Sequence, residues 1–195
     1  VECRANLKYE TMVIMKKAGC RLIVVGFETA DNQILKNMKK GLTIERMRQF
    51  VSDARKAGIM VHSCFMAGSK GETKETLMKS LKFAKEMNAD TCQFFPLMVY
   101  PGTEAYEWAK TSGYLTTSDY SKWLTEEGLH NCVVSTPELS AKDLVDFCDY
   151  ARRNYYLGAK YLGYKLIRVL KNPGEMRKTI KSARTFVKYL FRKSA

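Results

Sequence analysis

The strongest constraint on the fold is a repeated alternation of amphipathic helical stretches and short apolar runs through the first 115 residues. Each helical stretch ends at a breaker such as Ala-Gly, and a β-branched or aromatic run follows at once. The predicted strands cover residues 22–27, 59–66 and 91–98, and the predicted helices cover residues 8–18, 32–38, 44–57, 75–87 and 104–112. Strands separated by helices pair in parallel through right-handed crossovers. The alternation therefore predicts an α/β sheet or barrel.

The strand predicted over residues 22–27 is apolar throughout, whereas a strand with one solvated face would alternate. We therefore expect this strand to be covered on both faces. The helix before it stops at Gly19, a residue that suits the left-handed position after a helix. The expected buried face of that helix consists of Met12, Ile14, Met15 and Ala18.

Polar or glycine-containing segments follow each predicted strand. These segments are residues 26–31, 66–73 and 96–103. Ligands of α/β folds gather at the carboxyl ends of parallel strands, so the three segments are candidate parts of one site. Glu28 ends an apolar strand as a carboxylate. It either accepts hydrogen bonds from a ribose diol or an amino group, or it caps the helix that follows, and the spacing alone leaves both interpretations open.

After residue 115 the alternation stops. The next stretch reads as an irregular connection with an edge strand near residues 132–134, and residues 140–143 have the form of a capping box that opens a helix to about Tyr156. Residues 172–175 repeat this device before an amphipathic, basic helix over residues 176–192. The predicted organisation is a barrel segment over residues 1–115, a connection over 116–139, and a helical, strongly basic extension over 140–195.

The net charge of +13 is concentrated in the last 45 residues. Residues 151–195 contain 13 lysines and arginines against the single acid Glu175, whereas residues 1–150 contain 20 basic and 19 acidic residues. Such a block indicates an anionic partner or a solvated helix face. One functional hypothesis is therefore a basic module, with residues 173–193 contacting an anionic membrane or, less favoured, nucleic acid, and with the barrel as a scaffold.

Several kinds of site are excluded at the level of motifs. The sequence has no phosphate-binding loop, no dinucleotide-binding glycine motif and no nucleophile elbow, and His62 and His130 lack partners at metal-ligand spacing. His62 lies in a predicted strand, where a structural role is favoured over catalysis. We therefore predict no catalytic residue and no metal ligand within this chain. The chain begins at Val1 without a signal peptide, which is typical of an internal fragment.

The cysteines and the hydropathy indicate the cellular compartment. The six cysteines lie at positions 3, 20, 64, 92, 132 and 148. Their gaps are too long for C-x-x-C or zinc-ligand spacing, so we expect reduced core thiols of a cytoplasmic protein. No window has the roughly 18 apolar residues that a membrane span requires. The expected localisation is cytoplasmic, with the basic extension allowing peripheral contact with the inner face of the membrane.

Four motifs occur in a fixed order at the strand ends and loops. They are Gly26-Phe27-Glu28-Thr29, Lys40-Gly41-Leu42-Thr43, Gly68-Ser69-Lys70-Gly71-Glu72-Thr73 and Tyr100-Pro101-Gly102-Thr103. In order and spacing they resemble the second half of the core domain of radical S-adenosylmethionine (SAM) enzymes, especially members with a cobalamin-binding domain ahead of that core. The opening Glu2-Cys3-Arg4 is similar to the end of the third strand of the same core. One departure is Lys70, which stands where the family motif has proline and so loosens the turn.

The resemblance implies a fold and a set of cofactors. The fold is a partial, TIM-like (β/α) barrel of six strands, of which this chain supplies the later ones, followed by the α-helical extension. The family holds a [4Fe-4S] cluster on a C-x-x-x-C-x-x-C motif and cleaves SAM reductively to a 5′-deoxyadenosyl radical. That motif is expected upstream of Val1, so the fragment alone is expected to be inactive. Whether cobalamin is also used, through an upstream domain, stays open.

The resemblance also implies site residues and partners. Glu28 and Thr29 are expected at the ribose or methionyl part of SAM. The strand end that includes Phe65, Met66 and Gly68 is expected along the adenine, and Tyr100 is expected at the substrate mouth. The implied partners are the upstream part of the same polypeptide and a small-molecule or lipid-like substrate. The reaction outcome, which includes methylation and cyclisation among its alternatives, stays open.

Overall fold

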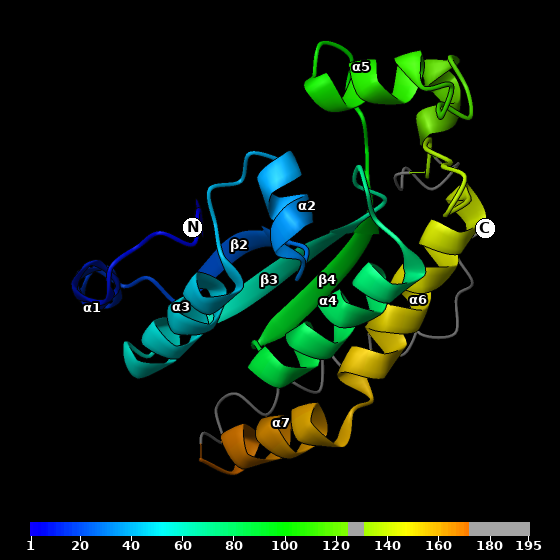
Figure 1. Ribbon diagram of the computed structural model, residues 1–195. Helices are drawn as coiled ribbons and strands as arrows, with labels where there is room; N and C mark the ends of the chain where they lie inside the picture. Colours follow the sequence, from blue (N-terminus) through cyan, green and yellow to red (C-terminus); the bar gives the residue numbers. More distant parts are fainter. Residues whose placement is uncertain (125–130, 172–195) are drawn as a thin grey trace.

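The computed structural model describes residues 1–124 and 131–171 and shows a parallel four-stranded sheet (Figure 1). The strands, in spatial order, are β1 (Glu2–Cys3), β2 (Leu22–Glu28), β3 (Met60–Ala67) and β4 (Thr91–Pro96). Every neighbouring pair is parallel, so each connection crosses over through helices, as the alternation predicted. The α/β fold class is thereby confirmed.

The helices are α1 (Tyr9–Lys17), α2 (Asn32–Asn37), α3 (Ile44–Lys56), α4 (Lys74–Met87), α5 (Glu104–Thr111), α6 (Ala141–Tyr156) and α7 (Ala159–Lys171), with a 3-10 turn, η1 (Tyr120–Trp123). Helices α1 to α6 follow the predicted order, whereas α7 and the 3-10 turn were not predicted. Threonine side chains cap α3, α4 and α5 at positions 43, 73 and 103. The capping box predicted at Ser140 forms with Asp143 and opens α6. The basic helix predicted over residues 176–192 lies outside the described residues.

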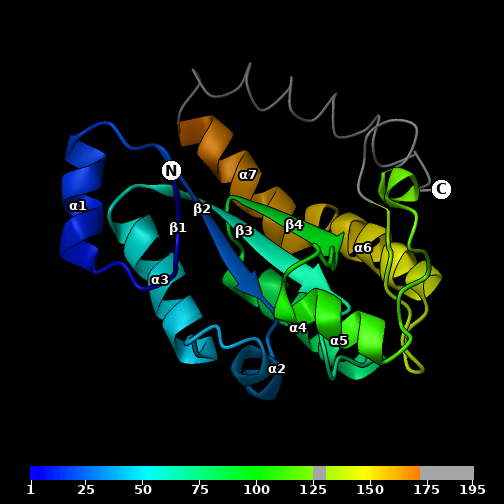
Figure 2. The same ribbon diagram turned by 90° about the horizontal axis from the view of Figure 1, so that it is seen from above.

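Helices α3, α4 and α6 lie along one face of the sheet, and α5 stands beyond the carboxyl end of β4 (Figures 1 and 2). Burial alternates along β2, where Ile23, Val25 and Phe27 are buried while Leu22 is exposed. The expectation that this strand is covered on both faces is therefore wrong for the described residues, because their helices pack on one face only. We call the other side, which carries Val24 and Gly26, the open face.

Two predictions from the sequence were wrong: part of the buried face of α1 and the edge strand near residues 132–134. Met12 of α1 is fully buried as expected, but Ile14 is 66% exposed and Ala18 is exposed as well, because α1 contacts the core through only a narrow part of its surface. The edge strand expected near residues 132–134 is instead one isolated antiparallel bridge between Leu115 and Val134.

Two absences hold for the described part of the chain. All six cysteines are free thiols, and no three or more histidine, cysteine or acidic side chains in residues 1–124 and 131–171 gather as metal ligands would. Within the same residues, no helix combines the length and the apolar character that crossing a bilayer demands.

Helix α7 contacts Asp90, just before β4, through two tyrosine hydroxyls and one arginine. Tyr161 donates a hydrogen bond to the carbonyl of Asp90, and Tyr164 donates to the Asp90 carboxylate at 2.8 Å. Arg168 forms an ion pair with the same carboxylate, which also accepts the Val61 amide at 3.0 Å. Asp90 therefore links α7 to the start of β3, at the end of the sheet opposite the carboxyl edge.

Candidate functional site

The carboxyl ends of β2, β3 and β4 meet at one edge of the sheet, where the three candidate segments come together (Figure 1). Strand pairing places Gly26, Cys64 and Gln93 in one row across the open face, and it pairs Met66 with Phe95 closer to the edge. The three segments predicted from the sequence therefore share one edge of the sheet.

Glu28 has an unusual backbone that directs its carboxylate over the open face. Its φ is +68°, in the left-handed region that is uncommon for residues other than glycine, and the β2–β3 register shifts between Gly26 and Glu28. A Cβ atom added to Gly26 would lie 2.2 Å from the Glu28 Oε1 atom. The carboxylate therefore occupies the space that the missing side chain of Gly26 leaves.

The Glu28 carboxylate is held by a lysine from the connection between α2 and α3. The Lys40 Nζ atom lies 2.5 Å from Glu28 Oε1, and Glu28 is only 7% exposed. The Arg4 guanidinium, at the end of β1, donates a 2.6 Å hydrogen bond to the Lys40 carbonyl. These three residues form a chain of contacts across the mouth of the sheet, which we call the Arg4–Lys40–Glu28 relay.

Cys64 lies on the open face next to this relay. Burial raises the pKa of its thiol to about 11, and the negative charges of Glu28 and Glu2 contribute to that rise. The thiol is therefore protonated at neutral pH and has little character as a nucleophile or metal ligand.

Thr29 points away from the open face. Its side chain is fully buried, and its hydroxyl lies 3.3 Å from the Ser80 hydroxyl of α4 and accepts the Asp31 amide. Asp31, rather than Glu28, caps α2, because its carboxylate accepts the amides of Gln33 and Ile34. The alternative that Glu28 is a helix cap is therefore wrong. The Thr29 hydroxyl contacts α4 on the helix-covered side of the sheet.

The end of β3 separates two residues that were expected to act together. Phe65 and Met66 are consecutive strand residues, so their side chains lie on opposite faces. Phe65 is fully buried on the helix face, where its ring stacks on Phe94 with centroids 5.1 Å apart. Met66 is half-buried and packs near Leu97 toward the carboxyl edge. Of the two side chains, only that of Met66 is placed to contact a ligand.

The turn after β3 is organised by Glu72, a residue that sequence reasoning named only within a motif. Its Oε2 atom accepts the amides of Gly68 at 2.6 Å and Ser69 at 3.0 Å. Burial raises the pKa of Glu72 to about 7, although these two amides lower it. Its Oε1 atom and the Ser69 hydroxyl are buried and have no hydrogen-bond partner among the described residues. With Lys70 in place of proline, the turn still closes through the Glu72 amide and the Ser69 carbonyl.

Gly68 and Tyr100 lie on the rim of the site. Gly68 has φ +106°, and a Cβ atom there would come within 2.7 Å of Leu144 in α6, so only glycine fits without rearrangement. Tyr100 is 52% exposed, and its carbonyl accepts the Thr103 hydroxyl that also caps α5. Tyr100 is thus exposed in the segment that follows β4, and its place at a substrate mouth stays a prediction.

His62 is held by a contact with the neighbouring strand, which is consistent with a structural role. Its Nδ1 atom lies 2.7 Å from the Thr91 hydroxyl on the neighbouring strand, and burial lowers the pKa of the ring. The imidazole is therefore neutral at physiological pH and is oriented by β4.

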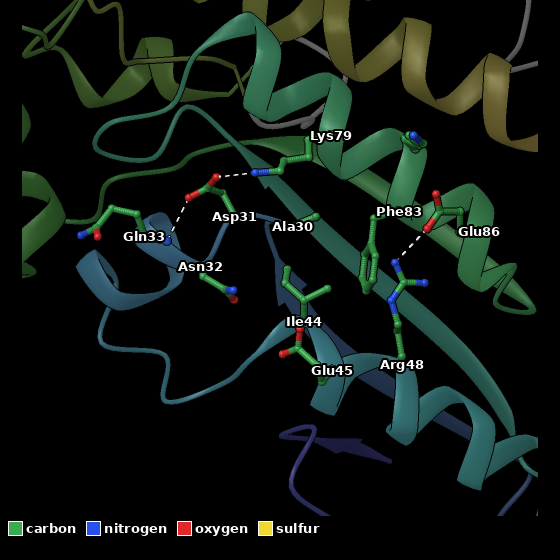
Figure 3. Close-up of a pocket in the computed structure, with 11 residues that line it drawn as sticks. Ala30, Asp31, Asn32, Gln33, Ile44, Glu45, Arg48, Lys79, Phe83 and Glu86 are labelled. Atoms are coloured by element: carbon green, nitrogen blue, oxygen red, sulfur yellow. Dashed lines mark hydrogen bonds and ion pairs between the residues drawn. The ribbon is translucent and has the colours of Figure 1, made fainter.

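A separate groove of about 610 Å³ lies between α2, α3 and α4, on the helix-covered side of the sheet (Figure 3). The ion pair of Lys79 with Asp31 spans 3.0 Å, and that of Arg48 with Glu86 spans 2.8 Å. Both pairs tie α4 to its neighbouring elements, and the Arg48 guanidinium also covers the Phe83 ring at 4.7 Å. The groove is therefore bordered by charges that already stabilise the helix layer, and the candidate site remains at the strand ends.

Comparisons with known proteins match the part of the chain that contains the first three strands. The family model of the radical SAM superfamily matches residues 2–84. An uncharacterized methyltransferase of Pyrococcus horikoshii, PH0819, is 30% identical over 148 residues, which cover 76% of this chain and 31% of that protein. The bacteriochlorophyllide d C-8(2)-methyltransferase of Chlorobaculum tepidum is 28% identical over 108 residues, covering 54% of this chain and 24% of that protein.

A solved structure shares the fold. The radical SAM methyltransferase TsrM of Kitasatospora setae, with cobalamin and a [4Fe-4S] cluster bound, superimposes with a TM-score of 0.61 at 20% identity, over 77% of this chain and 35% of that one. This chain spans between about a quarter and a third of the length of the two curated relatives. The family match and the relatives place residues 2–84 of this chain in the radical SAM superfamily, and the solved structure shows that the chain shares the parallel α/β fold of TsrM.

Proposed function

We propose that this chain supplies the later strands of the barrel in a radical SAM methyltransferase and binds the adenosyl part of SAM through Glu28. The observation that carries the proposal is the Glu28 carboxylate, which is buried at the carboxyl edge of β2 and held over Gly26. A carboxylate in this position suits a ribose diol, because its oxygens accept hydrogen bonds from hydroxyl donors. Methyl transfer is supported by the two curated relatives and by TsrM.

The described residues fit SAM but do not fit an iron–sulfur cluster. No set of three cysteine, histidine or acidic ligands gathers within them, and the Cys64 thiol is protonated. We therefore assign the cluster to cysteines outside this chain. When bound, cluster and SAM supply the radical or methyl chemistry. Cobalamin, which TsrM binds, is a further cofactor to test in the whole protein.

In this proposal, some of the predicted site residues contact a ligand and others support them. Glu28 orients the ribose, and Met66 with the backbone at Gly68 borders the adenine. Tyr100 contacts a small-molecule substrate at the rim, where its ring is exposed. Phe65 and Thr29 support these positions from the helix layer rather than by touching a ligand.

The alternative function, a basic module for anionic membranes or nucleic acid, depends on residues 173–193. Those residues lie outside the described part of the chain, and the names of the two curated relatives above mention neither a membrane nor a nucleic acid. The family match instead covers β1, β2 and β3 and the turn that contains Glu72. We therefore take SAM chemistry as the function.

The test uses the full-length protein, purified anaerobically with its cluster reconstituted. It should bind SAM, and after reduction it should release 5′-deoxyadenosine or S-adenosylhomocysteine. Glu28→Ala should weaken SAM binding by at least about tenfold, the cost of one hydrogen bond to a charged group. Glu10→Ala, at an exposed position of α1, is the matched control and should bind normally. A full-length protein that neither binds nor cleaves SAM would refute the proposal.

A further inference from the structure

We infer that Lys40 is a positioning residue that holds Glu28 in its ligand-binding conformation and is itself fixed by Arg4. This inference depends on the proposed role of Glu28 at the ribose. The Lys40 ammonium pairs with Glu28 Oε1 at 2.5 Å, and the Arg4 guanidinium holds the Lys40 carbonyl at 2.6 Å. None of the strand-end motifs alone shows this pairing, because Lys40 lies 12 residues after Glu28 in a loop.

Glu28 needs such a partner because its conformation is costly. A left-handed φ destabilises a residue with a Cβ atom by roughly 1–2 kcal/mol, and a buried carboxylate without a partner loses its hydration. Glu28 has both features, at φ +68° and 7% exposure. Without the Lys40 ammonium, the carboxylate would turn toward water and leave the space over Gly26. The ion pair therefore keeps the carboxylate over the open face.

The pairing also assigns the two carboxylate oxygens. Lys40 occupies Oε1, whereas Oε2 receives no hydrogen bond from the described residues. A carboxylate oxygen accepts about two hydrogen bonds, so Oε2 has both positions open to ligand hydroxyls, whereas Oε1 has one beside Lys40. Lys40 thus acts on the ligand through Glu28.

The backbone around Lys40 is shaped to point its side chain inward. Lys39 and Gly41, on either side of it, both have positive φ, +52° and +62°. The neighbouring Lys39 side chain is 72% exposed and pairs with Glu104, which is also exposed. The two consecutive lysines therefore differ in burial and partner although they carry the same charge. Lys39 is accordingly a matched control for Lys40.

The experiment measures ligand binding by calorimetry in the full-length, cluster-loaded protein. The probes are 5′-deoxyadenosine and its 2′,3′-dideoxy counterpart, which lacks the ribose diol. Lys40→Met should weaken binding of 5′-deoxyadenosine by about 10- to 100-fold and leave binding of the dideoxy compound unchanged. Lys39→Met should change neither affinity. A thermal melt of each variant checks the fold, and Lys40→Gln replaces Lys40→Met if that variant does not fold.

A double-mutant cycle decides whether Lys40 acts through Glu28. In a Glu28→Gln background, Lys40→Met should cause no further loss of affinity. Additive losses, or an equal loss for both ligands, would overturn the inference, because Lys40 would then contact the ligand itself or serve the fold alone. A wild-type protein that binds neither ligand would instead overturn the proposed function, so the two failures are distinguishable.

Discussion

Glu72 offers a quantitative test of how the turn after β3 is built. Its carboxyl group is 4% exposed, and burial raises its pKa from the ordinary 4.5 to about 7, against the lowering effect of the Gly68 and Ser69 amides. Glu72→Gln removes the titration but keeps an oxygen that accepts both amides. The substitution therefore isolates the ionisation from the geometry of the turn.

The sign and size of the effect follow from linkage. Between pH 4.5 and about 7 the unfolded chain has lost the Glu72 proton while the folded protein keeps it, so the free energy of unfolding falls as pH rises through this window. At about 1.4 kcal/mol per pH unit, the fall amounts to about 3 kcal/mol and is complete above pH 7. The Gln variant lacks this fall and should gain about 3 kcal/mol on the wild type between pH 4.5 and 8.

Guanidinium chloride titrations at pH 5, 6, 7 and 8 give the free energies of unfolding of wild type, Glu72→Gln and a control. The control is Glu107→Gln, an exposed carboxylate of α5. Subtracting the wild-type curve removes the contribution of every other titrating group. Parallel curves for Glu72→Gln and wild type would refute the reasoning, because Glu72 would then ionise alike in the folded and unfolded chains.

Three further substitutions test the scaffold through the free energy of unfolding in urea. Tyr155→Phe should lower it by about 1–2 kcal/mol, because the buried hydroxyl donates to the Ala89 carbonyl at 2.7 Å; an unchanged value would contradict that role. Gly68→Ala should cost more than about 2 kcal/mol through its positive φ and the contact with Leu144, and a neutral result would argue against both. Ser140→Ala should cost about 1 kcal/mol, whereas Ser140→Thr, which keeps the capping hydroxyl, should cost much less; equal losses would argue against the cap.

Local patterns were sufficient to predict the order of helices α1 to α6 and of the strands between them. Helix caps such as Thr43 and Ser140 act within three residues, and breakers such as Gly19 act at one position, so the printed sequence contains their whole cause. The strand ends follow from the same patterns, and the parallel topology then places them at one edge. The region of the site was therefore predictable, even though its contacts were not.

Helix α7 shows where periodicity misleads. Its apolar stripe of Leu162, Leu166 and Leu170 is 51–72% exposed, while tyrosines on the opposite side face the sheet. The docking combines polar and aromatic contacts, since Tyr161 and Tyr164 bond to Asp90 and the Tyr161 ring packs on Tyr155 and Tyr156. A helix that docks through hydroxyl groups places its apolar stripe outward, and hydropathy alone predicts the reverse. The sequence patterns predicted no helix between Tyr156 and residue 172.

The residues of the candidate site lie on different faces of the sheet, and substitutions on the two faces should have different effects. Phe65 and Thr29 lie on the helix side, where substitutions change packing and hence the free energy of unfolding. Glu28 lies over the open face at a backbone position that costs energy, and it stays there because Lys40 compensates for that cost. The energy that the ion pair provides is largely used to offset the backbone strain at Glu28. The pair therefore adds little to the free energy of unfolding. If Glu28 binds the ribose as proposed, substitution of Lys40 should affect ligand affinity more than stability.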